Sequence, residues 1–154
     1  MFRGITDLNL DAKGRVAIPA RHRARLTVGT DGGPGGCVIV TLHPLDPCLL
    51  VYPVPEWERI ETAVTQQPNM DRQVLMLQRR LIGHAEECEL DGQGRILLSA
   101  SLRKRAGLDK RVVLVGQGNK FELWDEQRWT SELDKWADED NGGGLSAALQ
   151  SLSL

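Results

Sequence analysis

Two short segments of the sequence repeat an aspartate, a glycine and an arginine at one spacing. They read Asp11-Ala12-Lys13-Gly14-Arg15 and Asp91-Gly92-Gln93-Gly94-Arg95. An aspartate side chain can accept a hydrogen bond from the backbone two residues further on, and a glycine readily adopts the positive φ that closes a tight turn. We therefore expect a β-hairpin turn at each segment. The turn-forming and orienting residues are Asp11, Gly14, Asp91 and Gly94.

The cations of these segments are not needed to form a turn, and they indicate a binding role. We expect Asp11 to lie across the hairpin from Arg15 and to hold its guanidinium in one orientation. An arginine held in this way is suited to bidentate contact with O6 and N7 of guanine in the DNA major groove. Lys13, at the tip, is placed to contact phosphate as a point charge. Because the second segment has Gln93 at that position, the first hairpin is the better anchor.

Other basic residues cluster near the first segment. Residues 1–30 carry six Lys or Arg residues against two Asp, whereas residues 121–140 carry two against eight Asp or Glu. The chain as a whole has a formal charge of −2. A bipolar molecule can still present a basic face to phosphate while its total charge is acidic. The candidate DNA-binding residues are Arg3, Lys13, Arg15, Arg21, Arg23, Arg95 and Arg103.

The similarity between the two halves extends beyond the Asp-x-x-Gly-Arg segments. Residues 8–20 match residues 88–100 at an offset of 80, and residues 49–52 match residues 121–124 at an offset of 72. The offset changes within the glycine-rich stretch 30–36, which only the first copy contains. A gap confined to one loop is typical of homologous units, so we predict a tandem duplication.

Each copy is predicted to run strand, tight turn, strand, short helix, strand, loop, strand and helix. After the first turn, alternation of apolar and polar residues predicts a strand at 15–18. Trp57, Ile60 and Val64 recur at helical spacing, which predicts a helix beginning near Pro55. The other expected elements are strands 38–40, 49–52, 95–98, 112–115 and 121–124, helix 20–26, a connecting helix 70–82 and a helix from Asp125.

The predicted fold class is α+β and β-rich, with two tandem units forming a pseudo-two-fold small β-barrel flanked by short helices. A unit of about 50 residues buries too little surface to be stable alone, so the two must share one core. We expect the first unit at 1–66, a connecting helix at 67–84, the second unit at 85–140 and a flexible tail at 141–154. The edges of such a sheet invite pairing with other subunits.

The segments Leu10–Pro19 and Leu90–Ser99, together with the opening Met1-Phe2-Arg3-Gly4, closely resemble the bacterial MraZ family. The resemblance spans about residues 1–140. Two copies of Asp-x-x-Gly-Arg at this separation are a specific signal, whereas a single copy is found in many AbrB-like regulators. One departure is visible, because Ser99 stands where the family usually has a second proline. This departure concerns only the rigidity of that turn.

The resemblance implies an AbrB-like (SpoVT-AbrB) fold in each half and a ring-shaped homo-oligomer. It also implies a transcriptional regulator, here expected to be a repressor, at the promoter of the division and cell-wall gene cluster that includes its own gene. The family's signature falls on Asp11 with Arg15 and on Asp91 with Arg95. The expected partner is double-stranded DNA carrying short direct repeats.

Three other interpretations remain open. The sequence has no HExxH, GxSxG or P-loop motif, so we expect no enzyme and no cofactor. Cys37, Cys48 and Cys88 form no CxxC pair and are expected to be reduced core thiols, although His43, Cys48 and His84 are an alternative metal site of unusual spacing. The last alternative is an oligomeric protein-interaction module with no direct DNA role, suggested by the acidic C-terminal helix and the leucine-rich tail.

The sequence also bears on where the protein works. It contains no apolar run near the roughly 18 residues that a membrane helix needs, and its first residues do not resemble a signal peptide. We therefore expect a cytoplasmic, nucleoid-associated protein with no membrane partner.

Overall fold

The computed structural model describes residues 1–30, 35–139 and 146–152, and its elements follow the duplicated order. The first copy contains β1 (Ile5–Asn9), β2 (Arg15–Ala17), α1 (Ala20–Leu26), β3 (Cys37–Leu42), β4 (Leu49–Pro53) and α2 (Val54–Thr65). A connection of α3 (Arg72–Leu77) and the π-helical turn η1 (Gln78–Ile82) follows. The second copy contains β5 (Glu86–Glu89), β6 (Arg95–Leu97), α4 (Ala100–Arg105), β7 (Arg111–Gly116), β8 (Phe121–Asp125) and α5 (Glu126–Glu139), and α6 (Ala147–Gln150) comes last.

The strands of the two copies are interleaved. Six of them form an antiparallel sheet in the order β1-β7-β8-β4-β3-β5, while β2 pairs only with β6 in a separate two-stranded ribbon. In this arrangement β1 of the first copy pairs with β7 of the second, and β5 of the second pairs with β3 of the first. Each copy therefore needs the other to complete its hydrogen-bonded ladders.

The strand-rich α+β class with two repeats is confirmed, but the expected closed barrel is not formed. Within the part of the chain that the structure describes, β1 and β5 are the two edges of the large sheet. Each continues through a tight turn into a strand of the ribbon, but β2 and β6 are only three residues long and pair with each other. The ribbon packs over one face of the large sheet, but it is not hydrogen-bonded to β1 or β5 in one continuous ladder.

One hydrophobic core lies between the large sheet and the ribbon with its two short helices. Both copies contribute equivalent side chains to it, such as Val16 with Ile96 and Ile18 with Leu98, and all four are at most 1% exposed. On the other face of the sheet, α2 and η1 cover a cluster centred on Trp57, and α5 covers another cluster. Because the main core draws on both halves, neither copy has a core of its own.

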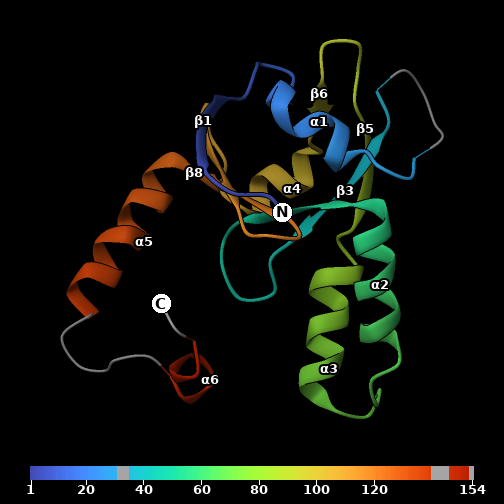
Figure 1. Ribbon diagram of the computed structural model, residues 1–154, viewed down its shortest axis with the longest axis vertical. Helices are drawn as coiled ribbons and strands as arrows, with labels where there is room; N and C mark the ends of the chain where they lie inside the picture. Colours follow the sequence, from blue (N-terminus) through green and yellow to red (C-terminus); the bar gives the residue numbers. More distant parts are fainter. Residues whose placement is uncertain (31–34, 140–145, 153–154) are drawn as a thin grey trace.

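The helices extend from different sides of the sheet in Figure 1. Helix α2 packs against the connection between the copies, where Val64 and Leu81 share a cluster, and the pair projects as an arm. Helix α5 leaves from the opposite flank, and the tips of the β1–β2 and β5–β6 hairpins lie at the top of the view. No helix among the described residues has the length and apolar character needed to cross a membrane. The predicted flexible tail lies partly outside the described residues, which there comprise 146–152.

Candidate nucleic-acid interface

The first hairpin is closed by one carboxylate. Asp11 Oδ1 accepts the backbone N–H groups of Lys13 at 2.9 Å and Arg15 at 2.8 Å. Its Oδ2 accepts the Nε–H of Arg15 at 2.7 Å. Gly14 has φ +89° and donates its backbone N–H to the Asp11 carbonyl at 3.0 Å. Turn formation and arginine orientation therefore depend on the same side chain.

The second hairpin repeats this geometry. Asp91 Oδ1 accepts the backbone N–H groups of Gln93 and Arg95, both at 2.9 Å, and Oδ2 accepts the Nε–H of Arg95 at 2.8 Å. The N–H of Arg15 is the main cause that lowers the pKa of Asp11 to about 2, and the N–H of Arg95 lowers the pKa of Asp91 in the same way. Both carboxylates are therefore ionised at neutral pH, when they orient their arginines.

The ribbon brings the two oriented arginines onto one face. Its register pairs Arg15 with Leu97 and Ala17 with Arg95, while Val16 pairs with Ile96. Because side chains alternate along a strand, the first two pairs share the outer face and the third enters the core. Each arginine side chain is 30% exposed. The Nε–H of each is bound to its aspartate, so the terminal Nη groups remain for a ligand.

The remaining candidates are not all gathered around this face, because Arg3 precedes β1 and lies at the end of that strand away from the Asp11 turn. Lys13 at the tip and Arg3 near the N-terminus are exposed. Arg21 is also exposed, and its Nη donates to the Thr6 hydroxyl of β1 at 2.7 Å. Sequence reasoning left Lys104 and Arg105 on α4 out of the site, although both are exposed basic residues next to the second hairpin in the chain.

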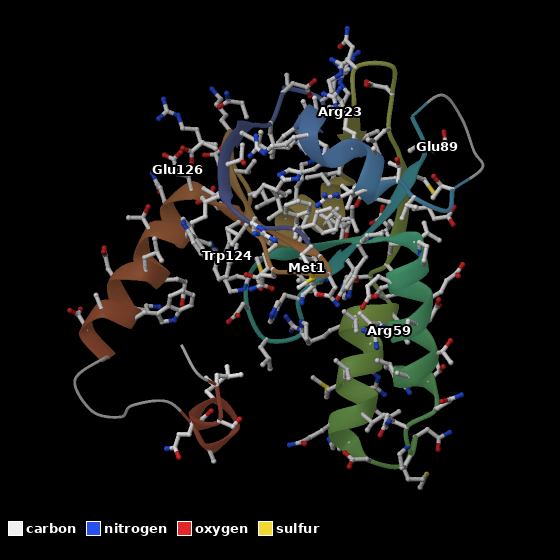
Figure 2. The ribbon with its side chains drawn as sticks, in the orientation of Figure 1. Met1, Arg23, Arg59, Glu89, Trp124 and Glu126 are labelled. Atoms are coloured by element: carbon white, nitrogen blue, oxygen red, sulfur yellow. The ribbon has the colours of Figure 1, made fainter. Side chains whose placement is uncertain are left out.

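Arg23 and Arg103 are placed differently from the other candidates. Both are only partly exposed, and their Nε–H groups donate to backbone carbonyls, Ile18 at 2.8 Å and Leu98 at 3.2 Å. Figure 2 shows Arg23 at the hairpin end of the molecule. Single-sequence patterns could not separate these two arginines from exposed ones, because the backbone groups that they meet come together only in the tertiary fold.

The alternative metal site finds no matching cluster. Among the described residues, no group of three His, Cys, Asp or Glu side chains is arranged to hold a metal ion. The Nδ1 of His43 accepts the backbone N–H groups of Leu45 and Asp46, so its lone pair is already used. Cys48 is fully buried, and burial raises the pKa of its thiol far above the ordinary value. All three cysteines are free thiols.

The fold and the site define a class: a tandem duplication whose interleaved halves present two carboxylate-oriented arginines on one exposed β-ribbon. The chain belongs to the MraZ family. The family model described as "MraZ protein, putative antitoxin-like" matches residues 1–80 and again residues 81–150. The resemblance read from the doubled Asp-x-x-Gly-Arg segments is thereby confirmed.

Named relatives match the chain over most or all of its length. A transcriptional regulator MraZ from Thioalkalivibrio sulfidiphilus is 61% identical over 155 residues that span all of both chains. The protein of the same name from Nitrosococcus oceani is 56% identical over 135 residues, 88% of each chain. The one from Yersinia pestis is 47% identical over 156 residues and all of both chains.

Proposed function

We propose that this protein is a sequence-specific DNA-binding transcriptional regulator that reads short direct repeats through its two Asp-x-x-Gly-Arg hairpins. The observation that carries the proposal is the ribbon face, on which Arg15 and Arg95 are each held by a carboxylate. The relatives named as transcriptional regulators support the same function.

The ribbon suits the DNA major groove in shape and chemistry. The groove admits a two-stranded β-ribbon, and a guanidinium fork matches O6 and N7 of guanine. Arg15 and Arg95 are therefore assigned to base contacts. Lys13, Arg3 and Arg21 are assigned to phosphate, where a cation fixes position without reading sequence. Arg23 and Arg103 complete the basic face from the two short helices.

The proposed target is the promoter of the division and cell-wall gene cluster, including the protein's own promoter. Binding there as a repressor places the protein in the cytoplasm, on the nucleoid. The resemblance of the sequence to the MraZ family implies this target, and the relatives named as transcriptional regulators support the regulatory role alone.

Self-assembly into a ring is part of the proposal, and two unmatched surfaces support it. On one flank, α5 exposes Leu133 and Trp136 among acidic residues. On the other, a groove of about 560 Å³ is lined by Leu45, Met76 and Arg80 together with Pro44, Arg72, Gln73 and Leu77. Apolar area and opposite charge make these surfaces complementary between copies, and a head-to-tail contact of this kind generates rings when it closes.

A ring would present several ribbons to one stretch of DNA. Contacts that are weak singly then add through effective concentration, so binding should require several repeats in one molecule of DNA. Equal affinity for one isolated repeat and for the full set would contradict this part of the proposal.

The test is fluorescence anisotropy on the DNA upstream of the protein's own gene, with a scrambled competitor and a salt titration. We expect sequence-dependent binding that Arg15→Ala weakens by about 1–3 kcal/mol per site with relaxed base preference. Lys13→Ala should instead weaken all sequences alike and flatten the salt dependence. Wild-type affinity no better than for scrambled DNA would overturn the proposal.

The second candidate function is an oligomeric interaction module without a direct DNA role. The observation in its favour is the exposed Trp136 at the end of α5, because exposed aromatic residues are typical of protein interfaces. The two candidates differ in one result. A module keeps its weak, nonspecific DNA affinity in the Arg15→Ala variant, whereas a regulator loses specific binding and keeps its assembly.

A further inference from the structure

In each copy, the side chain of one arginine contacts the hairpin of the other copy. Arg23, on α1 of the first copy, lies against Gly94 in the second hairpin, and Arg103, on α4 of the second copy, lies against Gly14 in the first. Figure 2 shows Arg23 at the top of the molecule, where the β5–β6 hairpin rises. The relation is reciprocal, so it follows the pseudo-two-fold symmetry of the duplicated fold.

Hydrogen bonds connect each crossing arginine to the hairpin that it meets. Arg23 Nε donates to the Ile18 carbonyl at 2.8 Å, and the Ile18 N–H donates to the Gly94 carbonyl at 2.9 Å. In the equivalent pair, Arg103 Nε donates to the Leu98 carbonyl at 3.2 Å, and the Leu98 N–H donates to the Gly14 carbonyl at 2.9 Å. One residue thus joins each arginine to the opposite hairpin.

The two glycines have no room for a side chain on the side that faces the arginines. A Cβ at Gly14 would lie 2.6 Å from Arg103 Nε, and a Cβ at Gly94 would overlap the guanidinium of Arg23. Both glycines also have positive φ, +89° and +73°. A positive φ alone explains a glycine in a turn. The close approach adds a second constraint as long as each arginine keeps its hydrogen bond to Ile18 or Leu98, because a side chain at either glycine would have to displace that guanidinium.

We propose that Arg23 and Arg103 are positioning residues, each of which holds the opposite copy's hairpin and so fixes the reading arginine next to it. Arg23 supports Gly94 and thereby Arg95, and Arg103 supports Gly14 and thereby Arg15. The inference rests on the proposed DNA-binding function and reassigns these two residues within it. Their guanidiniums act on the protein backbone, and phosphate is not their main partner.

The test compares Arg23→Gln with a matched control, Arg21→Gln, which removes the same charge from an exposed arginine of the same helix. A phosphate contact contributes about 0.9 to the slope of log affinity against log salt. We expect Arg21→Gln to flatten this slope and to keep the preference for specific over scrambled DNA. We expect Arg23→Gln to leave the slope unchanged and to lower that preference about two- to twelvefold, the cost of immobilising one released side chain on binding.

Crossed phenotypes distinguish a positioning role from a general loss of structure. Arg23→Gln should add nothing to Arg95→Ala in a double-mutant cycle, whereas it should combine additively with Arg15→Ala. Arg103→Gln should show the opposite pattern. A flattened salt slope with retained preference, or coupling to the arginine of the same copy, would overturn the proposal.

A measurement without DNA keeps this inference separate from the proposed function. In native-state hydrogen exchange, the Ile18 amide should exchange faster in Arg23→Gln than in Arg21→Gln, with little change in Tm. If the Gln variant does not fold, Arg23→Lys, which keeps the charge and loses the planar fork, takes its place. Failure of the wild type to prefer specific DNA refutes the function, whereas an unchanged Ile18 exchange rate refutes the positioning role.

Discussion

The Asp11→Asn variant would separate the two tasks of this carboxylate, shaping the turn and orienting the arginine. An asparagine oxygen can still accept the N–H groups of Lys13 and Arg15 that Asp11 Oδ1 accepts now. Its amide nitrogen takes the place of Oδ2, and an NH₂ group cannot accept the Nε–H of Arg15. The hairpin should therefore persist while the guanidinium becomes free to rotate.

The magnitude follows from what Arg15 then loses. A free side chain must be immobilised when it binds a base edge, which lowers specific affinity about two- to twelvefold for one rotamer-rich side chain. The substitution also removes one negative charge from the face that meets DNA, so affinity for scrambled DNA should hold or rise. The ratio of specific to scrambled affinity should consequently fall further than the specific affinity itself.

The assay is competition anisotropy with specific and scrambled DNA, supported by circular dichroism to verify the fold. The matched control is Asp7→Asn, because Asp7 lies on the exposed side of β1 and has no side-chain hydrogen bond or ion pair with any described residue. It changes the local charge equally without releasing an arginine. Equal specificity ratios in the two variants would refute the idea that the carboxylate preorganises Arg15.

Three further outcomes are expected. Because folding lowers the pKa of Asp11 from 3.8 to about 2 and lowers that of Asp91 too, their ionised forms stabilise the fold above about pH 4. This contribution to stability is lost as the pH falls towards 2. In an acid titration followed by circular dichroism, the variant with both Asp11→Asn and Asp91→Asn should therefore lose less stability than the wild type over this pH range. Leu97 is 57% exposed on the ribbon face, where we expect it to contact a thymine methyl group. Replacing thymine by deoxyuridine in the DNA should therefore lower the affinity of the wild type more than it lowers the affinity of the Leu97→Ala variant. Burial raises the pKa of both Cys37 and Cys48, so access of the reagent separates them: iodoacetamide at pH 8 should modify the partly exposed Cys37 and spare the fully buried Cys48, and mass spectrometry of the folded protein checks this.

The features that could be predicted from the sequence are those that close within a few residues. The turn at Asp11 needs only its own five residues, because the aspartate, the glycine and the arginine bond to one another. Helix α1 begins directly after Pro19 and ends at Leu26, as the residue types predict. The duplication was also visible, since it requires only comparison of the chain with itself.

The features that escaped prediction depend on residues far apart in the chain. The apolar run 112–115 marks β7 as a strand, but it does not say that this strand pairs with β1 across more than a hundred residues. The open sheet also depends on long-range pairing. β2 and β6 pair with each other and not with the edge strands of the large sheet, and local sequence does not specify this. Arg23 looks like any helical arginine until Gly94 is placed against it.

Comparison of the two copies indicates what kind of DNA site the ribbon can read. Three pairs of exposed positions differ: Ala12 and Gly92, Lys13 and Gln93, and Ala17 and Leu97. The aspartates and arginines that bond within each hairpin, and the glycines and arginines that pack between the copies, are the same in both copies. The supporting geometry is therefore symmetric, while the surface that would face the bases is not. A protein with exact two-fold symmetry binds a palindromic DNA site. Because the two hairpins of this ribbon are unequal, they favour an asymmetric site. An assembly of identical copies would then bind several such sites arranged as direct repeats.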